Sequence, residues 1–185
     1  GCIVKNNLIP VFIDSESCNK FIINVDKIEE QITPNTRAMC IPDLMGNMPN
    51  WEKIRELAKK YNLLILEDSA DILGGKYKNK PTGNYSDISI TSFYGSHIIN
   101  CAGNGGALCI NDKSVMERAK LLRSWGRSSS IFDEKSEEIE NRFNVDIDGI
   151  PYDAKFIFEK IGYNLEGSEI GAAFGLAFLV CSIYV

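Results

Sequence analysis

Short hydrophobic runs alternate with helical patterns along most of this chain. Apolar or alternating runs predict strands at residues 8–13, 37–41, 63–66, 88–93 and 107–110. The run at 63–66 is continuous, as in a strand covered on both faces, and it stops at Glu67 and Asp68.

Helical patterns lie between these runs. Asn50 is a candidate N-cap for a helix over 51–61, with Ile54, Leu57 and Ala58 on one face. Asp112 or Ser114 can cap a second helix that continues to about residue 125, and a third begins near residues 168–169. This alternation predicts an α/β fold with a mostly parallel sheet flanked by helices.

The character of the chain changes after Arg127. Residues 128–140 are polar and acid-rich and predict a solvated excursion, and residues 152–158 alternate like a hairpin strand. We therefore expect one domain over residues 1–127 and a second region over 128–185.

Composition narrows the possible functions of these 185 residues. The formal net charge of −5 argues against a nucleic-acid footprint or a polybasic membrane surface. The only histidine is His97, which excludes a zinc site built mainly from imidazoles.

Cysteine usage and the apolar C-terminal end bear on location. The six cysteines form no C-x-x-C pair, and we expect buried free thiols in a reducing, cytoplasmic compartment. Residues 170–185 carry no charge; a core helix is favoured over a membrane anchor because the run is shorter than a typical span.

Two polar features follow predicted strands, where open α/β sheets bind ligands. Asp68 ends an apolar strand, so its carboxylate needs a partner: a cationic ring nitrogen of a cofactor, a salt bridge or a helix N-terminus. Residues 92–106 combine Ser92 and His97 with glycines, which lets backbone amides approach a phosphate. A histidine in such a loop is also compatible with a purely structural role.

Taken in order, these motifs resemble the DegT/DnrJ-type sugar aminotransferases, which use pyridoxal phosphate (PLP) and have the aspartate aminotransferase fold (fold type I). The resemblance extends from about residue 7 to residue 179. It rests on EDSAD at 67–71, LGGKY at 73–77, SFY at 92–94, GGA at 105–107, LLRSWGR at 121–127, GYNL at 162–165 and EIGAAFGL at 169–176.

The resemblance implies roles for five residues. Asp68 would pair with the pyridinium nitrogen of the cofactor, and Ser92 would bind its phosphate. Asn164 would reach the phosphate of a partner subunit's cofactor, which implies a homodimer with shared active sites. Asp71 stands where many members carry a His or Gln that stacks on the ring, and an Asp at this position resembles the dehydratase branch instead. His97 stands where the aminotransferases carry the lysine that holds the cofactor covalently.

Histidine at position 97 implies a changed reaction. Imidazole forms no stable imine, so PLP or pyridoxamine phosphate (PMP) would be held non-covalently, while the imidazole can still move a proton near neutral pH. The resemblance therefore implies C-3 dehydration of a nucleotide-linked 4-keto-6-deoxyhexose, in deoxysugar and lipopolysaccharide biosynthesis, with an amino donor such as glutamate.

Several alternatives stay open. One subgroup of these dehydratases binds an iron–sulfur cluster on cysteines after the R-x-W-G-R motif; Ser128 follows here, so no iron–sulfur cluster and no metal is expected. The chain is also compatible with an aminotransferase relative of altered activity, or with a truncated, non-catalytic chain. The family's N-terminal segment and C-terminal small domain have no counterpart here, so we expect the fragment alone to be inactive.

Overall fold

A computed structural model describes residues 1–17, 19–131, 138–143 and 145–183. The chain divides into two compact units, one formed by residues 1–109 with 170–185 and the other by residues 110–169. The boundary expected near Arg127 lies inside the second unit. The assignment of the two regions to a PLP-binding domain and a smaller domain stays a prediction.

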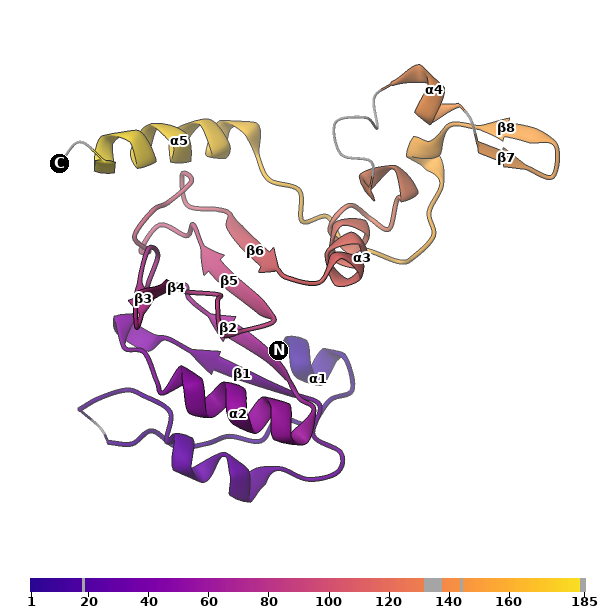
Figure 1. Ribbon diagram of the computed structural model, residues 1–185. Helices are drawn as coiled ribbons and strands as arrows, with labels where there is room; N and C mark the ends of the chain where they lie inside the picture. The colour runs from indigo at the N-terminus through magenta and orange to yellow at the C-terminus, as the bar shows by residue number, and fades with distance from the viewer. Residues whose placement is uncertain (18, 132–137, 144, 184–185) are drawn as a thin grey trace. The chain divides into compact units, whose positions relative to one another are not determined.

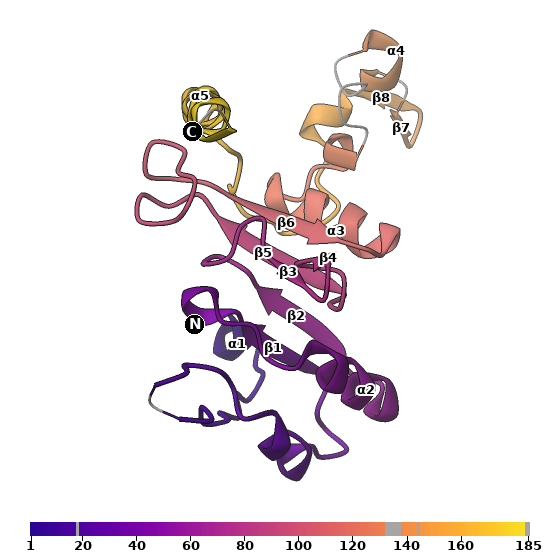
Figure 2. The same ribbon diagram turned by 60° about the vertical axis from the view of Figure 1, so that its left-hand side comes forward.

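The first unit is built on a four-stranded sheet. Figure 2 shows the strands in the order β1 (Ala38–Pro42), β2 (Leu64–Asp68), β5 (Ile88–Ser92) and β6 (Gly106–Ile110). β1 pairs with β2 and β2 with β5, both in parallel, with Pro42 opposite Asp68 and Asp68 opposite Ile90. The three parallel strands therefore end at one edge of the sheet, which confirms the predicted α/β fold.

Helix α2 (Trp51–Tyr61) lies along β1 in Figure 1 and begins where the sequence predicts. The Asn50 side chain accepts a hydrogen bond from Lys53 N at 3.1 Å, so this residue is the N-cap. The helix ends at Asn62, whose left-handed backbone lets the chain turn directly into β2.

One hydrophobic core joins this helix to the sheet. Ile54 of α2 and Ile65 of β2 are completely buried. The core residues are Val25, Ile28, Met39, Ile41, Trp51, Ile54, Leu57, Ala58, Leu63 and Ile65. Burial alternates along β1 and β2, so only one face of these two strands is covered by the core. The expectation that the strand at 63–66 is covered on both faces is wrong, because Leu64 is exposed.

Smaller elements complete the first unit. A helical turn, α1 (Cys2–Lys5), lies at the N-terminus, and a short hairpin joins β3 (Lys76–Tyr77) to β4 (Lys80–Pro81). Helix α5 (Glu169–Ile183) begins where predicted. In this helix Gly171 and Gly175 are buried, and both approach Cys101 of the loop between β5 and β6.

The second unit contains α3 (Lys113–Arg123), α4 (Ile139–Arg142) and a hairpin of β7 (Val145–Ile147) and β8 (Ile150–Tyr152). Asp112 caps α3 by accepting from Val115 N at 2.9 Å. The strand predicted at 152–158 is wrong, because the hairpin turns at Asp148 and Gly149, both at positive φ, and only Tyr152 of that range belongs to it. Residues 132–137 of the predicted polar excursion lie outside the described residues.

Three further expectations are wrong. Residues 8–13 form no strand, because among the described residues the ladder contact near them is a single bridge between Ser15 and Ile23, which leaves them without a paired neighbour. The described cysteines are free but not buried: Cys101 is half-buried and the others are exposed, while Cys18 lies outside the described residues. The apolar run is helical, but within the first unit most side chains of residues 170–181 are exposed rather than in a core.

Candidate active site

The carboxyl ends of the three parallel strands bring polar side chains to one edge of the sheet. Asp43 directly follows β1, Asp68 is the last residue of β2, and Ser92 is the last residue of β5. This is the edge at which open α/β sheets bind ligands, because the loops that leave it diverge and open a crevice.

Asp68 is half-buried and pairs with no cation among the residues that the structure describes. Its Oδ1 accepts a hydrogen bond from Ala70 N at 3.2 Å, within its own turn. This turn is not one of the partners considered from sequence, and within the described part of the chain neither a salt bridge nor a helix N-terminus occupies the carboxylate. Asp68 is therefore available to a cationic group of a ligand.

Asp71 and His97 lie next to each other although the sequence separates them. The Nε2 atom of His97 is 3.7 Å from Oδ1 of Asp71, which is within ion-pair distance. The other carboxylate oxygen of Asp71 accepts from the backbone N of Met45 at 2.9 Å. The Nδ1 atom of His97 is buried and has no hydrogen-bond partner. Asp71 is thus fixed by the turn after β1 and can orient the imidazole.

The loop after β5 carries Ser92 and His97. The Ser92 hydroxyl accepts from Tyr94 N at 3.2 Å, and His97 N donates to the Tyr94 carbonyl at 3.0 Å. The Tyr94 and His97 rings meet edge to face, with centroids 6.1 Å apart. These contacts fold the loop back on itself, so that the serine and the histidine are held by a compact turn.

Asn164 belongs to the second unit. It forms an antiparallel bridge with Ser124, and its side chain is exposed. Its expected contact with a partner subunit's cofactor stays a prediction.

Two buried carboxyl groups behind the edge were missed by the sequence reasoning. Asp43 is completely buried, and Glu67 is 1% exposed. Burial and the neighbouring carboxylate of Glu67 raise the pKa of Asp43 to about 8. Asp43 lies at the carboxyl end of a strand, as Asp68 does. The argument from strand ends that identified Asp68 therefore applies to Asp43 as well.

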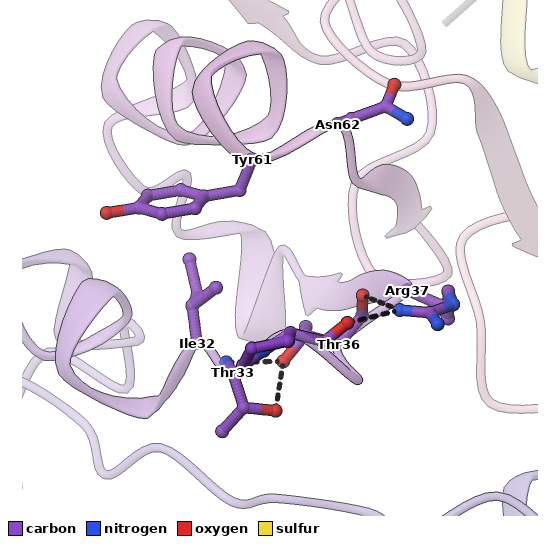
Figure 3. Close-up of a pocket in the computed structure, with 7 residues that line it drawn as sticks. Ile32, Thr33, Thr36, Arg37, Tyr61 and Asn62 are labelled. Atoms are coloured by element: carbon purple, nitrogen blue, oxygen red, sulfur yellow. Dashed lines mark hydrogen bonds between the residues drawn. The ribbon is translucent and has the colours of Figure 1, made fainter.

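The structure also contains a hollow of about 390 Å³ at the opposite end of β1, between the turn at 32–37 and the end of α2 (Figure 3). Arg37 is the charged residue in its lining, and its guanidinium already donates to the carbonyls of Pro34 and Thr36. The hollow lies away from the carboxyl edge and gathers none of the candidate residues.

Among the described residues, no group of three or more His, Cys, Asp or Glu side chains is arranged to hold a metal ion. In the same part of the chain, no helix has the length and apolar character to cross a bilayer.

Comparisons with curated proteins identify relatives that are much longer than this chain. It is 34% identical over 176 residues to the lipopolysaccharide biosynthesis protein RfbH of Salmonella typhimurium, with 94% of this chain and 40% of that protein aligned. It is 32% identical to the dTDP-4-dehydro-2,6-dideoxy-D-glucose 3-dehydratase of Saccharopolyspora spinosa, with 94% of this chain and 38% of that protein aligned. The chain thus spans about two fifths of the length of these relatives.

Solved structures place the fold among sugar aminotransferases. PseC of Helicobacter pylori, an aminotransferase of pseudaminic acid biosynthesis, superposes with a TM-score of 0.78 at 27% identity, over 98% of this chain and 43% of PseC. A GDP-4-keto-6-deoxymannose-3-dehydratase superposes equally well, with a TM-score of 0.78 at 22% identity, over 96% of this chain and 44% of that one. The family model covers residues 1–181, and the chain belongs to the DegT/DnrJ/EryC1/StrS aminotransferase family.

Proposed function

We propose that this chain is part of an enzyme that removes the C-3 hydroxyl of a nucleotide-linked 4-keto-6-deoxyhexose, with PLP or PMP held non-covalently. The observation that carries the proposal is His97 in the loop after β5, beside Asp71 and with a buried, unpartnered Nδ1. Imidazole cannot hold the cofactor as a lysine amine does, but it can transfer a proton.

The residues at the sheet edge fit a phosphorylated pyridine. Asp68 offers a carboxylate without a cationic partner, which suits a protonated ring nitrogen. Ser92 and the glycine-rich loop that follows it offer a hydroxyl and backbone amides, which suit a phosphate. When bound, PMP supplies the amine that condenses with a sugar ketone and an electron sink for the elimination.

The two nitrogens of the His97 imidazole have different roles in the proposed reaction. Asp71 faces Nε2 at 3.7 Å, so it favours a proton on that nitrogen and leaves the lone pair of Nδ1 free. Nδ1 would be the atom that accepts a proton when the site is loaded, and the Asp71 carboxylate would stabilise the resulting imidazolium. The same histidine can return the proton to the departing hydroxyl, which leaves as water.

The names of two relatives support this class of substrate. One acts in lipopolysaccharide biosynthesis and the other is a sugar 3-dehydratase. Other relatives are GDP-perosamine synthases, one of them 33% identical over 168 residues, so an aminotransferase is the alternative. His97 favours dehydration over amination, because no lysine stands at that position of the loop.

The proposal includes partners. An amino donor such as glutamate would regenerate PMP, and a second copy of the chain would complete the site through Asn164, whose side chain is exposed. No iron–sulfur cluster is needed in this scheme, and the expected cytoplasmic location follows from the substrates' place in deoxysugar biosynthesis.

Product analysis tests the reaction. The protein, in its full natural length and in this 185-residue form, is incubated with PMP, glutamate and CDP-, GDP- or dTDP-linked 4-keto-6-deoxyhexoses. The proposal expects a 3-deoxy sugar from the full-length protein, and loss of at least about 100-fold in rate for His97→Asn. An amino sugar as the product would support the aminotransferase alternative and overturn the proposal.

Borohydride trapping tests non-covalent binding separately. Wild-type protein with PLP should show cofactor absorbance that is lost on gel filtration in denaturant after reduction, because no imine to the protein exists. His97→Lys should retain the cofactor covalently after the same reduction. A covalent adduct in the wild type would contradict the role given to His97.

A further inference from the structure

Asp43 and Glu67 form a buried carboxyl pair behind the sheet edge. Asp43 is completely shielded from solvent and Glu67 is 1% exposed. Burial first, and the charge of the neighbouring Glu67 carboxylate second, raise the pKa of Asp43. Two adjacent buried carboxylates repel each other, which favours a proton on one of them at neutral pH.

The hydrogen bonds around the pair show which residue carries that proton. The two oxygens of Glu67 accept from Ser69 Oγ at 3.2 Å, from Gly83 N at 3.0 and 2.9 Å, and from Ser86 Oγ at 2.8 Å. These donors stabilise an ionised Glu67. Asp43 Oδ1 accepts from Trp51 Nε1 at 3.1 Å, whereas its Oδ2 has no donor. The proton therefore belongs on Oδ2 of Asp43, where it can be donated to Glu67.

The turn that begins at Asp43 contacts both Asp68 and Asp71, the first at its backbone carbonyl and the second at its carboxylate. Asp43 N donates to the Asp68 carbonyl at 2.9 Å, which ties the turn to the end of β2. Met45 N donates to Oδ2 of Asp71 at 2.9 Å. Met45 and Gly46 have φ of 55° and 78°, so the turn holds a non-glycine residue in the left-handed region. A strained turn of this kind needs an anchor to keep its shape.

We propose that Asp43 is a positioning residue that acts as a neutral acid. Its Oδ2–H donates to Glu67, and this buried anchor fixes the turn at 43–46 so that Met45 N–H holds Asp71 against His97. The importance of Asp43 for catalysis rests on the proposed function. The series of contacts from Asp43 through the turn and Asp71 to His97, which we call the relay, can be tested without turnover.

Ionisation of Asp43 should disturb this relay. The titratable groups that face Asp43 are Glu67 and Asp68, both from β2, and α2 contributes the Trp51 indole, which does not titrate. Above the Asp43 pKa of about 8, a third negative charge joins these two carboxylates, and Oδ2 can no longer donate. The turn then loses its anchor, and the position of Asp71 relative to His97 changes.

The lone histidine provides the readout. Because the chain has one histidine, its imidazole CH resonances are assigned without ambiguity in the NMR spectrum of the 185-residue protein. In the wild type these resonances should show, besides the imidazole's own protonation, a second step with a midpoint of about 8. Asp43→Asn, whose amide donates to Glu67 without titrating, should keep the wild-type shifts at neutral pH and lack the second step.

Two further variants complete the test. Asp43→Ala removes the donor and should displace the His97 resonances at neutral pH. Asp26→Asn, at an exposed carboxylate paired with Lys53, should behave as the wild type. The proposal is overturned if the wild type lacks the second step, if Asp43→Asn retains it, or if the alanine variant reproduces the wild-type shifts. Failure of the dehydration assay alone would overturn the proposed function and leave this relay standing.

Discussion

Replacing Asp43 with asparagine should abolish most of the pH dependence of stability between about pH 5 and about pH 8. The pKa of this carboxyl is about 8 in the folded protein, against 3.8 for an unperturbed aspartate. The folded chain therefore binds a proton in this window that the unfolded chain releases. The stabilisation that this carboxyl contributes is fully present below its pKa in the unfolded chain. It is lost as pH rises through its pKa in the folded protein.

The size of the effect follows from the same two values. Each pH unit inside the window changes the free energy of unfolding by about 1.4 kcal/mol for one proton. From about pH 5 to about pH 8 the wild type should therefore lose about 4 kcal/mol from this group. That is a large share of the stability of a typical domain, which is about 5–15 kcal/mol. The surface carboxyls with lowered pKa titrate below this window, so they contribute little there; they are Asp26, Glu29, Asp112 and Asp153.

Urea unfolding of the wild type and Asp43→Asn across this pH range measures the difference directly. The difference in free energy of unfolding should grow with pH in favour of the asparagine variant, because the amide costs nothing to keep neutral. Asp26→Asn serves as the control, since its carboxylate is exposed and its difference from the wild type should stay constant in the window. A constant difference for Asp43→Asn as well would refute the assignment of the proton to Asp43.

Two packing predictions follow from glycine positions. A Cβ at Gly126 would lie 1.8 Å from the Lys160 carbonyl oxygen, so Gly126→Ala should cost about 3 kcal/mol or more in urea unfolding. Gly149→Ala is the control: its φ of +81° is similar, but open space surrounds it, and a cost of about 1 kcal/mol is expected; equal costs would contradict the clash. A Cβ at Gly175 would lie 2.4 Å from the Cys101 sulfur, so Gly175→Ala should speed amide hydrogen exchange in α5. Adding Cys101→Ala should restore slow exchange, and failure to do so would argue against this contact.

Local sequence patterns were sufficient to predict those elements whose formation depends on residues close together along the chain. Helix α2 begins and ends as predicted, because the Asn50 cap and the spacing of Ile54, Leu57 and Ala58 are short-range properties. The sheet strands after it, β2, β5 and β6, were located to within two residues for the same reason. Asp68 and Ser92 follow as strand-end residues once the strands are known.

The wrong predictions share a physical cause. The strand expected at 8–13 has an apolar run, but a strand also needs a paired neighbour for its backbone groups. The hairpin lies at 145–152 and not at 152–158, because the turn at Asp148 and Gly149, both at positive φ, fixes its position, whereas alternation alone does not. Exposure of the cysteines depends on which strand faces are covered, and this is a property of the packed sheet.

The sequence by itself determined the family and the order of the sheet strands and of the helices between them, because motifs and short periodicities carry this information. Only the tertiary structure placed Asp71 beside His97 and buried Asp43 beside Glu67. The members of each pair lie far apart along the chain, and the loss of solvent around Asp43 raises the pKa of its carboxyl. Burial of that kind arises when the strands assemble, and no local pattern contains it.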